Sequence, residues 1–359
     1  MRSKLSRFLL AVTVFAGLLS LPAAVVAQST PQRSLLALSK RNHTLAIVDP
    51  STLQVIARAP VGPDPHEVIA SSDGKTAYIS IYGGGRYHAL SVIDLVRQTA
   101  LPDIDTGVLN GPHGLAFVGG KVWFTAEGAK VIATYDPATS KIDWVMGTGQ
   151  NRTHMIYVTL DLKQIYTTNV SSATVSILEK ITLPPMGPPP GIHPPAGAIP
   201  PPPDARQPRT DWNQTVIPVG KGDEGFDVSP DGRELWTADA EDGTLSVIDL
   251  ATRKVTATLD AKTFGANRLK FTPDGKLVLI SRLGDGDLVI YDAASRKEFK
   301  RVHIGHGAAG ILMDPDGARA FISCGPDNYV AVLDLKTLEV TGHIDVGGEP
   351  DGLAWAVRP

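Results

Sequence analysis

The apolar positions of this chain fall in short runs separated by turn residues, and the whole pattern repeats about every 42 residues from near residue 62 onward. Each repeat holds a short apolar run, an Asp-Gly turn, a second β-rich run, a loop, a run of the Val-Ile-Asp type and a last run that ends in Gly. The clearest copies begin at Gly220 and Gly305. Four short strands per unit at this period are typical of a propeller blade.

The Asp-Gly turns give the number of units. They lie at residues 73–74, 231–232, 274–275 and 316–317, and residues 119–120 and 161–162 fill the same place in two weaker copies. Gly suits such hairpins because it adopts a positive φ at no steric cost. Successive turns are about 41–47 residues apart, apart from one interval of about 70, which predicts six complete units between residues 62 and 347.

The two ends of the chain supply a seventh unit. Residues 347–355 match the opening strand of a unit, whereas residues 35–39, 44–49 and 54–62 match the second, third and fourth strands. Strands from both ends would then share one blade, which closes the ring and removes two exposed sheet edges. We therefore predict an all-β fold, a seven-bladed β-propeller with four-stranded antiparallel blades.

The N-terminus has the pattern of an export signal. Three basic residues precede the apolar stretch from Phe8 to Leu21, and small residues lead to Ala27. Because the apolar stretch is too short to span a bilayer, we expect residues 1–27 to be a cleaved signal peptide, residues 28–33 a short flexible N-terminus and residues 34–359 the propeller. The predicted location is periplasmic or secreted, with no membrane span.

Charge and cysteine content exclude some classes of partner and bond. Removal of the signal moves the formal charge from −3 to −6, and no Lys/Arg cluster remains, which argues against nucleic acid as a partner. Cys324 is the only cysteine, so no internal disulfide can form.

A Pro-rich insertion, residues 183–209, accounts for the long interval between turns. It interrupts one blade between its third strand, 174–178, and its fourth, 214–219. Proline at this density favours extended polyproline II or disorder over helix and sheet. A lengthened surface loop is one interpretation, and an arm that docks in an aromatic-lined groove of a partner is the other.

The repeat resembles the YVTN-type β-propeller repeat. Tyr166-Thr167-Thr168-Asn169 differs by one residue from the motif that names it, and Ser91–Leu95 and Ser246–Leu250 match its third strand. The resemblance covers the chain from residue 34 apart from the insertion. It implies a seven-bladed, usually exported propeller, related in fold to the propeller subunit of quinoprotein amine dehydrogenases and to the haem d1 domain of cytochrome cd1. The sequence contains no Cys-x-x-Cys-His motif for a covalently attached haem.

Alignment of the units on their turns places one residue per blade at the mouth of the innermost strand. We call these seven residues the column: His66, His113, His154, Glu224, Asn267, Ala309 and Asp351. Innermost strands line the central channel, so these side chains should converge near one of its ends.

Three histidines on consecutive blades are candidate ligands of a divalent transition metal, zinc in particular, because neutral imidazole is the commonest transition-metal ligand. Glu224 and Asp351 would then be candidate catalytic bases. The structural alternative is that His66, His113 and His154 fill a wet channel neck and bond neighbouring carbonyls.

Other polar residues are candidate ligand-binding groups at the same mouth. Asn267 belongs to the column, Arg152 and Arg268 stand beside it, and Arg86 and Arg282 occupy loops expected on the same face. A mixed-charge mouth suits a polar small molecule or a peptide.

Two classes of function stay open. The first is a non-catalytic, monomeric exported propeller that binds a partner protein or a small ligand on the histidine-bearing face. The alternative is a metal-dependent lyase or hydrolase that works from the channel mouth. A redox accessory role, by analogy with the amine dehydrogenase subunit, is a third.

Overall fold

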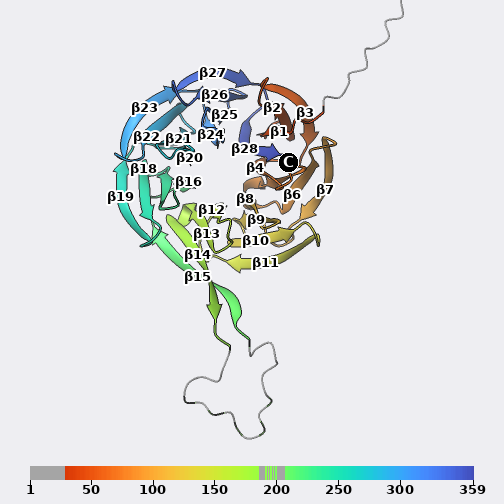
Figure 1. The fold of residues 1–359 in the computed structure, drawn as a ribbon, viewed down its shortest axis with the longest axis vertical. Coiled ribbons are helices and arrows are strands. Elements are labelled where there is room, and N and C mark those ends of the chain that lie inside the picture. Colours follow the sequence, from red (N-terminus) through yellow and green to blue (C-terminus); the bar gives the residue numbers. More distant parts are fainter. Residues whose placement is uncertain are drawn as a thin grey trace, which may run out of the picture.

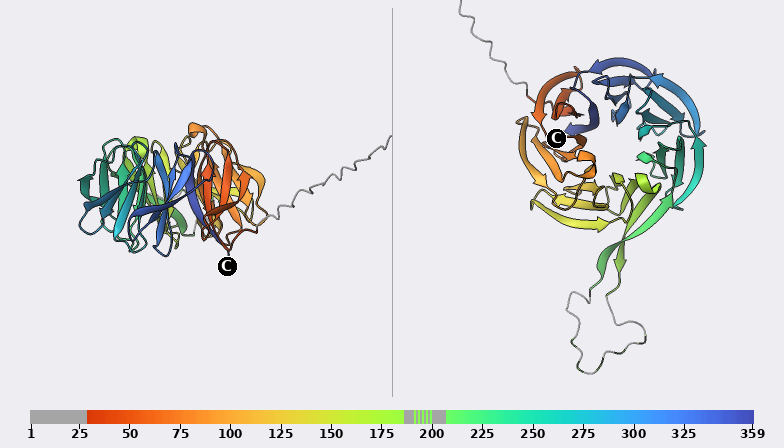
Figure 2. Two further views of the ribbon diagram at one scale, coloured as in Figure 1. Left: turned by 90° about the horizontal axis from the view of Figure 1, so that it is seen from above. Right: turned by 180° about the vertical axis from the view of Figure 1, so that it is seen from behind.

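The computed structural model describes residues 29–185 and 207–359, together with the single positions 191, 193, 195, 197 and 199. The predicted signal peptide and most of the Pro-rich insertion lie outside these residues. Within them the chain forms seven four-stranded antiparallel sheets, arranged as blades around a ring (Figure 1). Seen from the side, the ring is a flat disc (Figure 2). The predicted seven-bladed propeller is confirmed.

Blades are numbered here from the N-terminus, and the strands of each are given from the channel outward. Blade 1 consists of β28 (Pro350–Val357), β1 (Arg33–Ser39), β2 (Thr44–Asp49) and β3 (Gln54–Pro60); blade 2 of β4 (Pro65–Ala70), β5 (Thr76–Ile81), β6 (Ala89–Asp94) and β7 (Thr99–Asp105); blade 3 of β8 (Pro112–Val118), β9 (Lys121–Ala126), β10 (Val131–Asp136) and β11 (Lys141–Gly147); blade 4 of β12 (Thr153–Val158), β13 (Gln164–Asn169), β14 (Thr174–Leu183) and β15 (Arg209–Pro218).

The remaining blades follow the same order. Blade 5 consists of β16 (Asp223–Val228), β17 (Glu234–Asp239), β18 (Thr244–Asp249) and β19 (Lys254–Asp260); blade 6 of β20 (Ala266–Phe271), β21 (Leu277–Arg282), β22 (Asp287–Asp292) and β23 (Lys297–His303); blade 7 of β24 (Ala308–Met313), β25 (Arg319–Cys324), β26 (Tyr329–Asp334) and β27 (Glu339–Ile344). Two short 3₁₀ turns, η1 (Gly83–Gly85) and η2 (Val170–Ser172), lie in loops. Among the described residues, no helix is long and apolar enough to cross a membrane.

The ring closes as the repeat predicts. β28 pairs antiparallel with β1, with Val357 opposite Arg33 and Leu353 opposite Ala37. Blade 1 therefore contains strands from both ends of the chain, and neither β1 nor β28 is left with an unpaired edge facing the other.

The core lies between neighbouring blades, where the apolar faces of their sheets meet. Trp236 of blade 5 is fully buried and packs edge-on against Phe271 of blade 6, with ring centroids 5.8 Å apart. The Val-Ile-Asp strands end in polar turns, since the Asp carboxylates accept backbone N–H groups two or three residues further on. The carboxylates that do so are Asp49, Asp94, Asp136, Asp249, Asp292 and Asp334.

Blade 4 carries an extension that the sequence only partly predicts. β14 and β15 stay paired five residues beyond the expected strand end at Leu178, up to Leu183 opposite Arg209. The paired extension, residues 179–183 and 209–213, is called the arm here. It projects outward from the rim of the ring (Figures 1 and 2).

Candidate functional site

The seven column residues line one cavity of about 620 Å³ at one mouth of the central channel. Each is the second residue of its innermost strand. In every blade the register between the two innermost strands shifts at this position, which marks a β-bulge. A bulge turns a side chain out of the regular alternation of a strand. The same β-bulge in all seven blades therefore points the column side chains into the channel.

Glycines bring the inner strands close together just behind the column. The residue after the column residue is glycine in four blades, at Gly114, Gly225, Gly310 and Gly352. A Cβ at Gly114 would lie 2.5 Å from the backbone oxygen of His154, and one at Gly352 would lie 2.3 Å from that of His66. Only a residue without a side chain allows this approach, which sets the spacing of neighbouring column side chains.

A second ring of residues surrounds the column. It consists of the residue directly after the second strand of each blade: Lys40, Tyr82, Glu127, Val170, Ala240, Leu283 and Gly325. Lys40, Tyr82, Leu283 and Gly325 line the cavity. The cavity thus has a polar wall from blades 1–4 and a wall from blades 6 and 7 that includes Leu283, Ala309 and Pro326.

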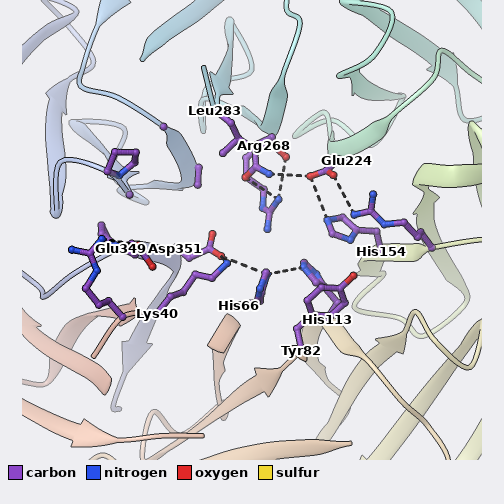
Figure 3. Close-up of a pocket in the computed structure, with 18 residues that line it drawn as sticks. Lys40, His66, Tyr82, His113, His154, Glu224, Arg268, Leu283, Glu349 and Asp351 are labelled. Atoms are coloured by element: carbon purple, nitrogen blue, oxygen red, sulfur yellow. Dashed lines mark hydrogen bonds and ion pairs between the residues drawn. The ribbon is translucent and has the colours of Figure 1, made fainter. Parts of the chain in front are cut away.

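The three column histidines stand side by side on the polar wall (Figure 3). The rings of His113 and His154 lie face to face, with centroids 3.8 Å apart and planes tilted by 33°. Nε2 of His113 is 3.2 Å from Nδ1 of His66. Tyr82 closes the group, since its ring packs edge-on against His66 and His113 at 4.7 and 5.0 Å.

Glu127, which the sequence analysis did not select, holds this group in place. Its carboxylate is buried, accepts a hydrogen bond from the Tyr82 hydroxyl at 2.5 Å and contacts Nδ1 of His154 through its other oxygen. Burial alone would raise the pKa of Glu127, but its bonds to His154 and Tyr82 and the nearby Arg152 outweigh burial and lower it. Glu127 is therefore ionised, and the His154 tautomer with a proton on Nδ1 is favoured.

Two imidazole nitrogens of this group, Nδ1 of His113 and Nε2 of His154, are buried without a hydrogen bond among the described residues. Nε2 of His154 lies 3.8 Å from a carboxylate oxygen of Glu224, a contact longer than a hydrogen bond (Figure 3). Burial and the neighbouring His154 and His66 lower the pKa of His113 well below its usual value, so this ring is neutral at physiological pH. Buried polar atoms normally have partners, and an unpaired imidazole nitrogen is a ready metal or ligand contact.

His66 belongs to a second, more exposed network at the mouth. Its Nε2 lies 3.0 Å from Asp64, and its Nδ1 lies 3.6 Å from Asp351. The hydrogen bond with His66 lowers the pKa of Asp64 to about 2. Lys40 completes the network, with Nζ 3.3 Å from Asp351 and 3.7 Å from Asp64.

Glu224 and Asn267 connect two arginines across the far side of the mouth. Arg152 donates to Glu224 at 3.2 Å, and the Asn267 amide donates to the other Glu224 oxygen at 3.0 Å. Arg268 donates to the Asn267 amide oxygen at 3.1 Å and is held by Glu67 of blade 2. The Arg268 side chain is 6% exposed, whereas that of Arg152 is 39% exposed, so Arg152 is the more accessible cation.

The structure does not bring every candidate residue to the mouth. Arg86 is exposed in the loop after η1 and bonds the Gly83 carbonyl, and Arg282 bonds Asp285 and the Phe264 carbonyl. Neither lines the cavity. Arg282 is the last residue of β21, so it lies at a strand end rather than in the loop that the sequence predicted.

The residues best placed to hold a metal ion differ in one member from the predicted set. Among the described residues, His113, Glu127 and His154 offer ligand atoms that lie within 4.8 Å of one another. His66 is outside this group and is engaged with Asp64 and Asp351. The role of the three histidines as a metal site stays a prediction.

Comparison with known proteins agrees with the fold. Residues 198–318, about a third of the chain, match the model of the "Cytochrome D1 heme domain" family. This segment includes Glu224, Asn267 and Arg268 but none of the three column histidines. No curated protein matches the sequence.

Several solved structures are similar over nearly the whole chain. A functionally unknown protein from Desulfotomaculum acetoxidans has a TM-score of 0.69 at 11% identity, covering 91% of this chain and 99% of its own. Hydrazine synthase of Kuenenia stuttgartiensis has a TM-score of 0.62 at 16% identity, covering 81% and 89%. The dihydro-heme d1 dehydrogenase NirN, in complex with DHE, has a TM-score of 0.58 at 15% identity, covering 94% and 78%. At these identities the similarity shows the propeller fold alone, and the YVTN name stays a prediction.

Proposed function

We propose that this propeller is a binding protein whose channel mouth takes a tetrapyrrole of the haem d1 class. The observation that carries the proposal is a pair of buried imidazole nitrogens without a hydrogen bond, His113 Nδ1 and His154 Nε2, on two residues that line a cavity of about 620 Å³. A bare metal ion needs far less space, whereas pockets for cofactor-sized ligands occupy about 300–1,000 Å³. The partial match to a haem d1 domain family supports the same class of ligand.

The residues present fit such a group. Imidazole is a common ligand of haem iron, and either of the two nitrogens without a hydrogen bond could supply it. The wall with Leu283, Ala309 and Pro326 offers apolar surface for a flat macrocycle. Arg152 and Lys40, both partly exposed at the mouth, could pair with the carboxylates of the ligand in exchange for their present partners.

The chain's own residues would bind and orient the ligand. Glu127 fixes the His154 ring through Nδ1, which leaves Nε2 to face the ligand, and the stacked rings restrict His113 in turn. A bound iron tetrapyrrole would supply electron-transfer or small-molecule ligation chemistry. We propose binding, rather than catalysis, as the role of the site.

The test is a titration of the purified full chain with haem d1 and with ferric protoporphyrin IX, followed by visible absorption. We expect saturable binding of haem d1 at one equivalent, with a shifted Soret band. His113→Ala and His154→Ala should each weaken it at least tenfold. His303→Ala is the matched control, because this exposed histidine lies on the outermost strand of blade 6. Wild-type binding that none of these substitutions alters would contradict the proposal.

A second candidate is a site for a transition-metal ion, favoured by the grouping of His113, Glu127 and His154. It corresponds to the alternative of a metal-dependent lyase or hydrolase, with Glu224 or Asp351 as the base. Metal analysis of untagged protein purified without chelators distinguishes the two candidates. Stoichiometric zinc or copper without tetrapyrrole binding would favour the metal site.

A further inference from the structure

A second cavity, of about 420 Å³, is lined by residues of blade 3 and of blade 4 with its arm. Three of the five tryptophans of the chain line it: Trp123 on β9, Trp144 on β11 and Trp212 on β15. We call this cavity the tryptophan groove. It is independent of the channel mouth, and none of the residues discussed above for the proposed function contributes to it.

The three indoles form a continuous aromatic surface. The ring centroids of Trp123 and Trp144 are 5.5 Å apart, and those of Trp144 and Trp212 are 5.8 Å apart, with planes tilted by 60° and 53°. Trp123 is buried, and its indole N–H donates to the Val118 carbonyl, which holds this ring at the bottom of the groove. Trp144 and Trp212 are partly exposed.

The two outer indoles have unused hydrogen-bond donors. Neither Nε1 of Trp144 nor that of Trp212 has an acceptor among the described residues, although the Trp123 indole has one. Trp is favoured where an apolar body and a polar N–H both meet a ligand. Tilted aromatic rings with free donors suit a ligand that is apolar and rich in acceptors.

A polyproline II segment is such a ligand. Proline rings pack on aromatic surfaces, the carbonyls of the segment accept hydrogen bonds, and prolines offer no N–H of their own. Because the segment is already extended before it binds, little conformational entropy is lost. Aromatic-lined grooves recognise Pro-rich segments in this way in several unrelated domains.

The chain supplies such a segment close in sequence to the groove, and the described positions within it, such as Ile199, are exposed and not engaged elsewhere on the propeller. Twelve of the 25 residues from 184 to 208 are proline, including four in succession at 200–203. They connect the ends of the arm, Leu183 and Arg209, and Trp212 is three residues from Arg209 on the same strand. The six residue steps from Pro203 to Arg209 span about 19 Å when extended. This is about twice the roughly 10 Å from Arg209 back to Trp212.

We propose that the tryptophan groove binds a polyproline II segment and that the segment it takes is residues 184–208 of the same chain. Tethering favours the chain's own segment over one added in solution, because a short connection raises the effective concentration to the millimolar range. The insertion is then the ligand of a groove on its own propeller rather than of a groove on a partner.

The test compares the full chain with a variant in which residues 184–208 are replaced by Asn-Gly. Leu183 and Arg209 are directly opposite in the ladder, so this two-residue turn closes the hairpin without shifting its register. A synthetic peptide of residues 184–208 is titrated into both proteins and followed by tryptophan fluorescence. We expect the peptide to bind the deletion variant saturably and the full chain at least tenfold more weakly, because the tethered segment competes.

Substitutions in the groove identify the site. In the deletion variant, Trp144→Ala and Trp212→Ala should each weaken peptide binding at least tenfold, whereas Trp355→Phe on β28 should leave it unchanged. A peptide with every proline replaced by alanine should not bind. If the deletion variant fails to fold, the full chain with Pro200–Pro203 replaced by Ser gives the second measurement, since acrylamide should quench its tryptophans more strongly than those of the wild type.

Three outcomes would overturn the proposal. A folded deletion variant without a response to the peptide would show that the groove takes no polyproline ligand. Equal affinity of both proteins for the peptide would show that the chain's own segment does not occupy the groove. A full chain that is dimeric and becomes monomeric on deletion would assign the groove to the segment of a second copy.

Discussion

Nδ1 of His154 on blade 4 contacts the carboxylate of Glu127 on blade 3, so a buried charge joins two blades directly behind the channel mouth. The same carboxylate accepts the Tyr82 hydroxyl of blade 2. One side chain therefore links three consecutive blades and orients the histidine stack. This group has both a stabilising and a positioning role.

Replacement of Glu127 by Gln should lower the free energy of unfolding by about 1–3 kcal/mol, because an amide cannot carry the charge that its three partners satisfy. The pKa of Glu127 is lowered in the folded state. The stabilisation that its carboxylate provides is therefore present above the usual carboxyl pKa of 4.5 and disappears as the pH falls through the lowered pKa. Urea unfolding at pH 7 and pH 4 should show a gap between wild type and variant that narrows at the lower pH.

The exposed Glu339 on β27 provides the control, because its replacement by Gln should change neither curve. In the binding titration, Glu127→Gln should also weaken haem d1 binding while His303→Ala does not. An unchanged stability and an unchanged affinity together would show that Glu127 does not position His154.

Asp223 should make the protein less stable as the pH rises. It is fully buried opposite Asp239 in the β16–β17 ladder, and its Oδ1 has no partner among the described residues. Burial raises its pKa to about 8, so the folded protein favours the protonated, neutral carboxyl group. The contribution of Asp223 to the free energy of unfolding is fully present below about pH 3.8 and is lost as the pH rises toward 8. The loss amounts to at most about 1.4 kcal/mol per pH unit.

Asp223→Asn removes this titration. The variant should therefore gain stability relative to wild type between pH 5 and pH 8, measured by urea unfolding at each pH. Parallel stability profiles of the two proteins over this range would show that Asp223 is not protonated in the fold.

Gly114→Ala should separate blades 3 and 4. Its Cβ would meet the His154 carbonyl oxygen at 2.5 Å and the Met155 Cα at 2.8 Å, and backbone atoms cannot move aside as a side chain can. We expect a loss of about 1–3 kcal/mol in thermal or urea unfolding, and weaker ligand binding because the His113–His154 stack opens. Gly147→Ala on β11 is the matched control, since a Cβ there meets nothing within 4 Å. Equal stability of the two variants would contradict the close-approach argument.

Truncation after Gly347 should abolish cooperative folding. It removes β28, which pairs with β1 and packs beside β4 and β24, and it exposes the edge of β1. Removal of Arg358 and Pro359 alone loses the hydrogen bonds from Arg358 to the Gln32 and Thr30 carbonyls and should lower the melting temperature by a few degrees. Circular dichroism melting distinguishes the two. A truncated chain that melts like the wild type would refute closure through β28.

The sequence was sufficient for the fold because each turn of the repeat recurs at a countable position. The same counting located the column, from His66 to Asp351, since the bulge recurs in every blade. It missed Glu127 because only the innermost strands were compared across the units. The position after the second strand, which holds Lys40, Tyr82 and Glu127, was an available signal.

Other features needed coordinates. Whether His66 or Glu127 joins His113 and His154 depends on side-chain directions around two bulges, which residue spacing does not determine. The tryptophan groove brings together Trp123 and Trp212, which are 89 positions apart and belong to different blades.

The shared blade also sets an order of events during synthesis. Among the described strands, β1, β2 and β3 are made first, whereas their partner at the channel, β28, is made after all the others. The six blades between them contain only strands that are consecutive in the chain, so each can assemble as it emerges. The first sheet must persist meanwhile with one open edge, and the ring gains its full cooperativity only in a final, long-range step.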